Sequence, residues 1–328
     1  MIQLKNIKKT FRVAKREKGT AAALLSLFHR EYREIHALDG ISFSVEKGEI
    51  AGFIGPNGAG KSTAIKIMSG ILTPDSGECT VLGMCPWNNR SKYVSHIGVV
   101  FGQRTQLWWD VPVHDSLELL GDIYKVDEKR FRENLGELSE ILELGDLLSV
   151  PLRQLSLGQR MRCEIAASLL HDPEVLFLDE PTIGLDALSK LAVRRIISDL
   201  NRKRNITVIL TSHDMEDIEA LTDRILLIGK GRLLYDGALG TLRSRYDSLR
   251  RLELQYEGTD VSAPLPEPAG TRLISKKDNH AVYEVDTGVI GISAALRLLG
   301  ETLDIRDMSA GSRPIEEIIA SLYREGNL

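Results

Sequence analysis

The segment Gly55-Pro56-Asn57-Gly58-Ala59-Gly60-Lys61-Ser62-Thr63 decides the fold. It matches the pattern G-x-x-x-x-G-K-[S/T], whose glycines let the backbone turn tightly and bring its N–H groups close to phosphates. A strand-like run, Glu49–Ile54, precedes it, and a helix-like run, Lys61–Ser69, follows it. The positive N-terminal end of that helix favours an anion. The pattern predicts a P-loop in which Lys61 reaches the β- and γ-phosphates of a nucleotide and Ser62 holds Mg²⁺.

Short apolar runs alternate with helix-like segments in the rest of the first two thirds of the chain. Val175–Leu178 and Thr207–Thr211 are apolar or β-branched and have the length of strands, and a leucine-rich helical region extends from about Ser116 to Leu148. Such alternation is typical of a parallel sheet covered on both faces. The sequence therefore predicts an α/β fold.

Two acidic residues, Asp179 and Glu180, follow the apolar run Val175–Leu178 directly. Ligand sites in parallel sheets lie at the carboxyl ends of the strands, so Asp179 is placed to hold Mg²⁺ and Glu180 to act as general base toward water. The alternative is a turn, because Asp-Glu-Pro also suits a helix N-terminus. His213 follows the next strand-like run and is placed to contact the γ-phosphate or the water near Glu180, although a lone histidine of this kind is more often structural.

Leu155-Ser156-Leu157-Gly158-Gln159 is a further motif between the P-loop and the acidic pair. Together with the P-loop, Asp179–Glu180, the following Gly184-Leu185-Asp186 and His213, it resembles the ATP-binding subunit of ABC transporters over about residues 1–235. The resemblance implies an ABC-type P-loop NTPase domain. Such a domain has a mixed-sheet core, an antiparallel β subdomain and a helical subdomain, here at about residues 104–165.

The resemblance also implies a head-to-tail homodimer or heterodimer of ATP-binding subunits, of which we expect the homodimer. Each ATP is then sandwiched between the P-loop of one subunit and the Ser156–Gln159 signature of the other, where the start of a helix offers donors to the γ-phosphate. The residues expected to bind ATP are Phe11, Gly55, Pro56, Asn57, Gly58, Ala59, Gly60, Lys61, Ser62, Thr63, Ser156, Gly158, Gln159 and Asp186.

The chain departs from the family pattern at three points: the signature, the glutamine motif and the spacing after Phe11. Leu157 replaces a glycine of the signature, but Ser156 and Gly158 remain, so we expect the phosphate contact to be kept. Gly102 occupies the usual position of the glutamine that contacts Mg²⁺ and water; Gln103 is assigned this role on the assumption of one inserted residue, with Gln106 as the alternative. The expected catalytic residues are Lys61, Gln103, Glu180 and His213, and the expected Mg²⁺ ligands are Ser62, Gln103 and Asp179.

Phe11 fits the position of the aromatic residue that stacks on adenine in the family; its alternative is an ordinary core phenylalanine. Residues 13–34 separate it from the next strand-like run and are basic, then apolar, then charged. We interpret them as an inserted, partly helical segment, with a solvated loop bearing one surface helix as the alternative.

Residues 236–328 differ in character from the preceding part. Strand-like Leu252–Tyr256 and Ala281–Val285 are followed by a helix at Ile292–Leu299, a strand at Leu303–Arg306 and an amphipathic helix at Pro314–Arg324. We expect a small α+β accessory domain. The resemblance suggests either a dimerisation or a ligand-sensing role for it, and dimer packing is favoured because no metal cluster or phosphate loop is visible there.

Composition excludes several classes of protein. The chain has 328 residues, a net charge of −4 and three cysteines without paired spacing, which disfavours a basic nucleic-acid-binding protein and a disulfide framework. It shows no signal peptide and no apolar run of the roughly 18–20 residues that a membrane helix needs. With the resemblance, this predicts a peripheral protein at the cytoplasmic face of the cell membrane. Its expected partners are polytopic permease subunits on separate chains, and not nucleic acid.

The expected function is that of an ATPase subunit that couples ATP-driven dimer closure and hydrolysis to export, similar to sodium- and drug-efflux ATPases. Trp108 and Trp109 lie where the family meets its membrane subunit, or else pack within the helical subdomain. A soluble ABC ATPase acting on ribosomes or nucleic acid is the alternative, disfavoured by the single P-loop and the absence of heptads. A non-hydrolysing nucleotide sensor is disfavoured by Glu180 and His213.

Overall fold

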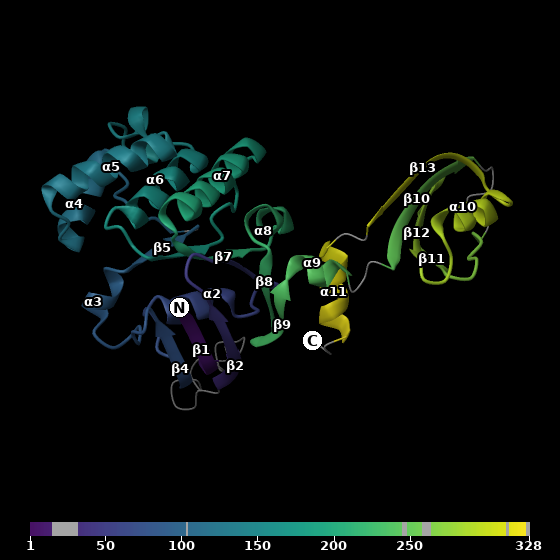
Figure 1. The fold of residues 1–328 in the computed structure, drawn as a ribbon, viewed down its shortest axis with the longest axis horizontal. Helices are drawn as coiled ribbons and strands as arrows, with labels where there is room; N and C mark the ends of the chain where they lie inside the picture. The colour runs from purple at the N-terminus through teal and green to yellow at the C-terminus, as the bar shows by residue number, and fades with distance from the viewer. Residues whose placement is uncertain (15–31, 103, 245–247, 258–263, 313–314, 326–328) are drawn as a thin grey trace, which may run out of the picture. The chain divides into compact units, whose positions relative to one another are not determined.

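The computed structural model describes residues 1–14, 32–102, 104–244, 248–257, 264–312 and 315–325. The chain divides into two compact units, Met1–Gly237 and Ala238–Leu328, and each is described by itself (Figure 1).

The first unit is built around a six-stranded sheet with the order β5-β6-β7-β3-β8-β9. The pairs β5/β6, β6/β7, β7/β3 and β3/β8 are parallel, and the interior strands are almost completely buried, as their apolar sequences predict. The strands are β3 (Ile50–Ile54), β5 (Ile97–Phe101), β6 (Val175–Asp179), β7 (Thr207–Ser212), β8 (Arg224–Gly229) and β9 (Arg232–Ala238).

Helices connect these strands. In Figure 1, α4, α5 and α6 gather at one side of the unit, beyond β5, and α7 lies next to α6. The helices are α2 (Lys61–Met68), α3 (Arg90–Val94), α4 (Val113–Tyr124), α5 (Glu128–Leu142), α6 (Leu157–Leu169), α7 (Ala187–Arg204) and α8 (Met215–Leu221), with short 3₁₀ turns at Gly145–Leu147 and Leu152–Gln154.

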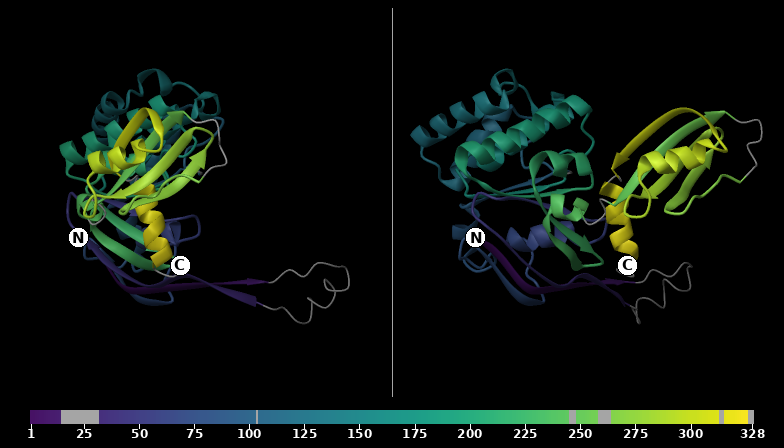
Figure 2. Two further views of the ribbon diagram at one scale, coloured as in Figure 1. Left: turned by 90° about the vertical axis from the view of Figure 1, so that its right-hand side faces the viewer. Right: turned by 45° about the vertical axis from the view of Figure 1, so that its right-hand side comes forward.

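A separate antiparallel sheet with the order β2-β1-β4 contains β1 (Ile2–Ala14), β2 (Tyr32–Val45) and β4 (Ser76–Val81). Its apolar face packs with α2 and the central sheet in one core. Pairing of β1 with β4 ends near Lys8, but pairing with β2 continues to Ala14 opposite Tyr32, so the two strands run on side by side beyond β4 (Figure 2). The ends of the expected insertion at 13–34 are therefore strand; residues 15–31 lie outside the described residues.

The second unit contains a four-stranded antiparallel sheet with the order β11-β12-β10-β13. Buried apolar side chains, among them Leu252, Leu254, Tyr283 and Leu299, form a core between this sheet and α10. β11 was not expected from the sequence. The elements are α9 (Leu239–Ser244), β10 (Leu249–Glu257), β11 (Thr271–Lys277), β12 (His280–Asp286), α10 (Ile292–Gly300), β13 (Asp304–Ser312) and α11 (Ile315–Glu325).

Candidate nucleotide site

The P-loop connects β3 to α2, and its glycines are required by the backbone. Gly60 has φ +113°, and a Cβ there would lie 2.4 Å from the carbonyl oxygen of Ala37. A Cβ on Gly55 would lie 2.4 Å from the carbonyl oxygen of Ile228. The loop can therefore approach its neighbours this closely only with glycine at both positions. Its residues Pro56–Gly60 line the cavity at the start of α2.

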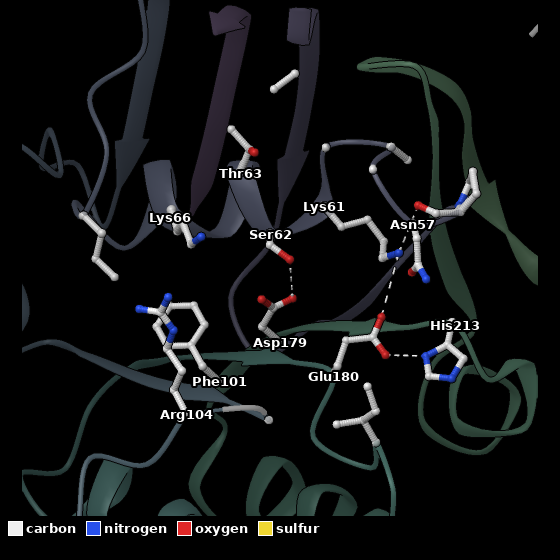
Figure 3. Close-up of a pocket in the computed structure, with 18 of the residues that line it drawn as sticks. Asn57, Lys61, Ser62, Thr63, Lys66, Phe101, Arg104, Asp179, Glu180 and His213 are labelled. Atoms are coloured by element: carbon white, nitrogen blue, oxygen red, sulfur yellow. Dashed lines mark hydrogen bonds and ion pairs between the residues drawn. The ribbon is translucent and has the colours of Figure 1, made fainter. Parts of the chain in front are cut away.

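Lys61, the first residue of α2, points back into the loop and is only 6% exposed. Its Nζ donates to the carbonyl oxygens of Gly55 (2.6 Å) and Pro56 (3.3 Å) and lies 3.8 Å from Oε1 of Glu180 (Figure 3). Burial lowers the pKa of Lys61, while the carboxylates of Glu180 and Asp179 act in the opposite direction. The lysine thus stands as a desolvated cation between the loop and the acidic pair.

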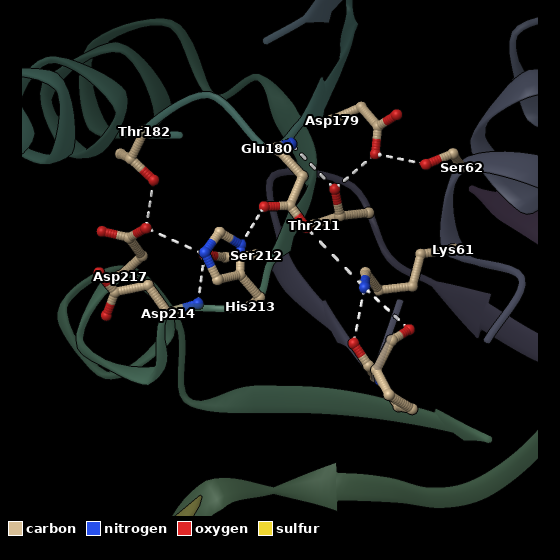
Figure 4. Close-up of polar contacts among 12 residues, drawn as sticks. Lys61, Ser62, Asp179, Glu180, Thr182, Thr211, Ser212, His213, Asp214 and Asp217 are labelled. Carbon is tan, nitrogen blue, oxygen red and sulfur yellow. Dashed lines mark hydrogen bonds and ion pairs between the residues drawn. The ribbon is translucent and has the colours of Figure 1, made fainter. Parts of the chain in front are cut away.

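Asp179 ends β6 and faces Ser62 at the start of α2. Its Oδ1 accepts hydrogen bonds from Ser62 Oγ (3.2 Å) and from Thr211 Oγ1 (2.7 Å) (Figures 3 and 4). A hydroxyl and a carboxylate side by side are hard oxygen donors that suit Mg²⁺, which often takes only one or two protein ligands beside phosphates. Within the described part of the chain no group of three or more His, Cys, Asp or Glu side chains could hold a metal.

Glu180 occupies a left-handed backbone conformation with φ +58°. Its N–H donates to Thr211, at Oγ1 (3.0 Å) and at the carbonyl oxygen (3.1 Å). Its Oε2 is hydrogen-bonded to Nδ1 of His213, while Oε1 faces Lys61 (Figure 4). Both carboxylate oxygens are therefore oriented, and the structure places His213 against Glu180.

Asp217, which is fully buried on α8, holds the loop after Glu180 in place. It accepts hydrogen bonds from Thr182 Oγ1 and from Ser212 Oγ (3.0 Å) (Figure 4). Arg194 on α7 also donates to it, at 2.6 Å. Neither Asp217 nor Thr211 was among the residues expected from the sequence. The Thr-Ser pair before His213 was the available signal, since hydroxyls at a strand's carboxyl end commonly meet a site.

A cavity of about 760 Å³ opens between the P-loop and the acidic pair, which is within the range of small-molecule sites. All P-loop residues from Pro56 to Thr63 line it, together with Asp179, Glu180 and His213. Phe11 also lines it and is 36% exposed, so it is not a core residue. Arg104 is a lining residue that was not expected.

Gln103, which the sequence suggests as the glutamine that contacts Mg²⁺ and water, lies outside the described residues. Gly102 donates its N–H to the carbonyl oxygen of Asp179 (2.8 Å), and a Cβ at 102 would lie 2.1 Å from the carbonyl oxygen of Glu180. A side chain at position 102 would therefore collide with the backbone of Glu180. Gln106 does not line the cavity; its Nε2 donates to the carbonyl oxygen of Glu164 at 3.2 Å.

The signature lies in a different place, where α6 begins. Ser156 Oγ accepts from the Gln159 N–H (3.3 Å), and Gln159 Oε1 accepts from the Ser156 N–H (2.8 Å), so the two cap the helix reciprocally. These residues and Gly158 line a second hollow of about 300 Å³ beside the start of α7. Asp186 caps α7 through the N–H and hydroxyl of Ser189, which lower its pKa. Within its own chain, the P-loop cavity is not lined by Ser156, Gly158, Gln159 or Asp186.

Comparison with known proteins adds independent findings. A family model described as ABC transporter matches residues 38–183. The ABC transporter ATP-binding protein NatA of Bacillus subtilis (strain 168) is 33% identical over 70% of this chain and 92% of NatA. The linearmycin resistance ATP-binding protein LnrL of the same organism is 35% identical (81% and 83% covered), and the daunorubicin/doxorubicin resistance ATP-binding protein DrrA of Streptomyces peucetius is 32% identical (89% of each).

Solved structures agree with these relatives. The dimeric, post-hydrolysis ATP-binding cassette MJ0796 bound to ADP and Pi superposes with a TM-score of 0.60 and 25% identity, covering 73% of this chain and 99% of the cassette. The structure of cbiO1 from Clostridium perfringens, part of the ABC transporter complex cbiONQ, superposes with a TM-score of 0.61 and 26% identity. It covers 74% of this chain and 90% of cbiO1.

Proposed function

The chain belongs to the ABC transporter family of ATP-binding proteins, and from this premise we propose that Lys61, Asp179 and Glu180 carry its ATP hydrolysis. The family and fold expected from the sequence are confirmed. The chain is an ATP-binding and ATP-hydrolysing transporter subunit that uses ATP and Mg²⁺ and works with permease subunits and a second ATP-binding subunit. The relatives are transporter proteins, which disfavours the alternative of action on ribosomes or nucleic acid.

We propose that the phosphates of ATP bind at the N–H groups of the P-loop and the start of α2. Lys61 then turns from the carbonyl oxygens of Gly55 and Pro56 toward the β- and γ-phosphates, because a desolvated ammonium gains more from anionic oxygens than from neutral carbonyls. Ser62 and Asp179 would hold Mg²⁺, which when bound neutralises charge on the phosphates. Phe11 lines the cavity wall where the family stacks adenine.

Glu180 is the proposed general base. Water attacks the γ-phosphorus, the bond to the β-phosphate oxygen breaks, and Glu180 accepts the proton of the water, which gives ADP and phosphate. His213 orients the Glu180 carboxylate through Oε2, so that Oε1 faces the phosphate side beside Lys61. The observation that carries this proposal is that one carboxylate joins the P-loop lysine to the histidine.

Substitution of the base tests the proposal. Glu180→Gln keeps the side-chain shape and removes the basic oxygen, so we expect turnover to fall by about 100-fold or more while ATP binding is kept. Glu140→Gln, an exposed substitution on α5, is the matched control and should turn over like the wild type. Turnover of Glu180→Gln at the wild-type rate would exclude Glu180 as the base.

We propose that the permease docks at the exposed apolar side chains of Trp108, Trp109 and Leu119. Trp108 N–H donates to Ser116 Oγ (3.1 Å), which ties the tryptophan segment to α4, where Leu119 lies one turn further on. Exposed aromatic pairs are typical of protein–protein hot spots. In the described ranges no helix is long and apolar enough to cross a membrane. Docking at this surface would hold the subunit at the cytoplasmic face of the cell membrane.

Co-purification from detergent-solubilised membranes tests this docking surface. Trp108→Ala combined with Leu119→Ala should reduce recovery of a polytopic membrane protein with the tagged chain, while Val289→Ala, an exposed change in the second unit, should not. Equal recovery with both variants would reject the surface. Recovery of ribosomes and no membrane protein with the wild type would reject the transport role.

Export and the role of the second unit are further parts of the proposal. The resistance names of LnrL and DrrA support export of a compound through the permease. For residues 236–328 we propose a role as an accessory domain in dimer packing, which is one of the two roles that the family resemblance suggests.

A further inference from the structure

The segment that carries the tryptophans is attached to the signature helix at a buried carboxylate. Glu164 on α6 is only 6% exposed and accepts hydrogen bonds from Thr105 Oγ1 and from the Gln106 N–H (3.2 Å). In return, Gln106 Nε2 donates to the carbonyl oxygen of Glu164 (3.2 Å). A buried carboxylate needs such partners, so residues 104–106 and the middle of α6 are joined as one unit.

A second attachment lies one turn earlier on α6 and reaches the signature itself. The guanidinium of Arg160 donates through Nε to the carbonyl oxygen of Leu155 (3.0 Å) and through a terminal nitrogen to that of Arg153 (3.2 Å). These carbonyls belong to the backbone that leads directly into Ser156. Arg160 therefore holds the entry to the signature from its own helix.

Trp109 covers this guanidinium from the solvent side. The central carbon of Arg160 lies 4.4 Å from the centroid of the Trp109 ring, and the Trp109 carbonyl oxygen accepts from the Arg153 N–H (3.1 Å). Trp109 is nevertheless 47% exposed, so part of its ring is available to a partner. The same residue thus contacts the solvent, the arginine and the backbone before the signature.

We propose that Arg160 is a positioning residue for the signature serine and that Trp109 holds Arg160 in its working orientation. This rests on the proposed function, since it is the signature that binds the second subunit's ATP. Arg160 acts on Ser156 through the carbonyls of Leu155 and Arg153 and does not line the P-loop cavity of its own chain. A permease contact on Trp109 therefore bears on the signature without passing through the P-loop cavity.

The test compares four variants of the full chain. Arg160→Ala should lower kcat by about tenfold, because two hydrogen bonds from a cation are lost. Trp109→Ala should lower kcat by about threefold, because the stacking on Arg160 is lost. Trp109→Phe keeps an aromatic ring at this position and should retain most of the wild-type kcat. Arg132→Ala is the control: this exposed arginine on α5 pairs with Glu128 of its own helix, and its loss should leave kcat at the wild-type value.

Two further readouts separate positioning from a general loss of structure. Affinity of the isolated subunit for ATP should stay within about twofold in all four variants, because the P-loop site is untouched. Amide hydrogen exchange of the peptide 153–160, measured without nucleotide, should be faster in Arg160→Ala and Trp109→Ala and unchanged in Trp109→Phe and Arg132→Ala.

Unchanged exchange and unchanged kcat in Arg160→Ala would overturn the inference. Loss of ATP affinity together with a lowered Tm would overturn it as well, because that result assigns Arg160 to the general fold. A wild-type chain without ATP turnover would instead contradict the proposed function, and hydrogen exchange would still decide whether Arg160 positions the signature.

Discussion

Thr211 contacts both acidic residues of the site through its hydroxyl, so removal of this hydroxyl tests how the two residues are positioned. The hydroxyl donates to Asp179 Oδ1 (2.7 Å) and accepts from the Glu180 N–H (3.0 Å), and the residue is fully buried on β7. Thr211→Val keeps the branched shape and removes both hydrogen bonds. The Glu180 N–H still has the Thr211 carbonyl oxygen at 3.1 Å, so the bond to the Asp179 carboxylate is the main loss.

A hydrogen bond to a charged group contributes about 1.5–3 kcal/mol, so the free energy of unfolding should fall by about 2 kcal/mol. To the extent that the hydrogen bond is made in the transition state and not in the enzyme–ATP complex, its loss lowers kcat, at most by roughly ten- to 100-fold, since about 1.4 kcal/mol corresponds to a factor of ten. Asp179 would also be less well oriented toward Mg²⁺, so the Mg²⁺ concentration for half-maximal turnover should rise. Thr211→Ser, which keeps the hydroxyl, should recover most of both quantities.

Thr207→Val is the matched control, because Thr207 is buried at the opposite end of the same strand. Its hydroxyl accepts from the Gly48 N–H (2.9 Å), so its loss should cost about 1 kcal/mol of stability. Steady-state ATPase assays over a range of Mg²⁺, with urea unfolding of each variant, measure both effects. If Thr211→Val and Thr207→Val shared one kcat and one Mg²⁺ dependence, Thr211 would have only a structural role and the reasoning would be refuted.

Two other substitutions probe the surroundings of the site. Gly102→Ala places a Cβ 2.1 Å from the Glu180 carbonyl oxygen and should lower ATP turnover at least about tenfold. Gly136→Ala on α5 is the control, because Gly136 has open space around it, and it should not lower turnover. Equal turnover rates in the two variants would show that the Glu180 backbone moves freely. Burial raises the pKa of Glu164, so the folded chain binds this proton more tightly than the unfolded chain and the stability contribution falls as pH rises through the raised pKa. The stability of Glu164→Gln relative to wild type should therefore improve as pH rises from about 4, the ordinary range of a glutamate, in urea unfolding. A difference that stays constant with pH would contradict the raised pKa.

The sequence predicts the P-loop and the acidic pair well because both are local. A phosphate loop needs glycine at particular backbone conformations, and Gly60 at φ +113° shows that requirement directly. A strand buried on both faces needs an unbroken apolar run, which Val175–Leu178 provides. His213 could be placed near Glu180 because neighbouring parallel strands end at the same sheet edge.

Other features depend on contacts between distant segments and could not be predicted. The role of Thr211 depends on Asp179 lying next to it on another strand, so in the sequence Thr211 is only a β-branched strand residue. β11 (Thr271–Lys277) is a polar edge strand without clear alternation, and Arg12 and Glu34 make the paired ends of β1 and β2 resemble a solvated loop. These strands are held by backbone hydrogen bonds to their neighbours, which the pattern of side chains does not indicate.

The left-handed backbone of Glu180 has a consequence for evolution and engineering. At φ +58° a residue other than glycine is strained by on the order of 1 kcal/mol, and this strain sits at the residue proposed as the base. Glu180→Gly would relax this strain, but it would also remove the contacts of the carboxylate to His213 and Lys61 and add conformational freedom to the unfolded chain. Backbone strain and side-chain contacts thus act on stability in opposite directions at this position, and a screen for more stable variants must retain ATP turnover as a second criterion.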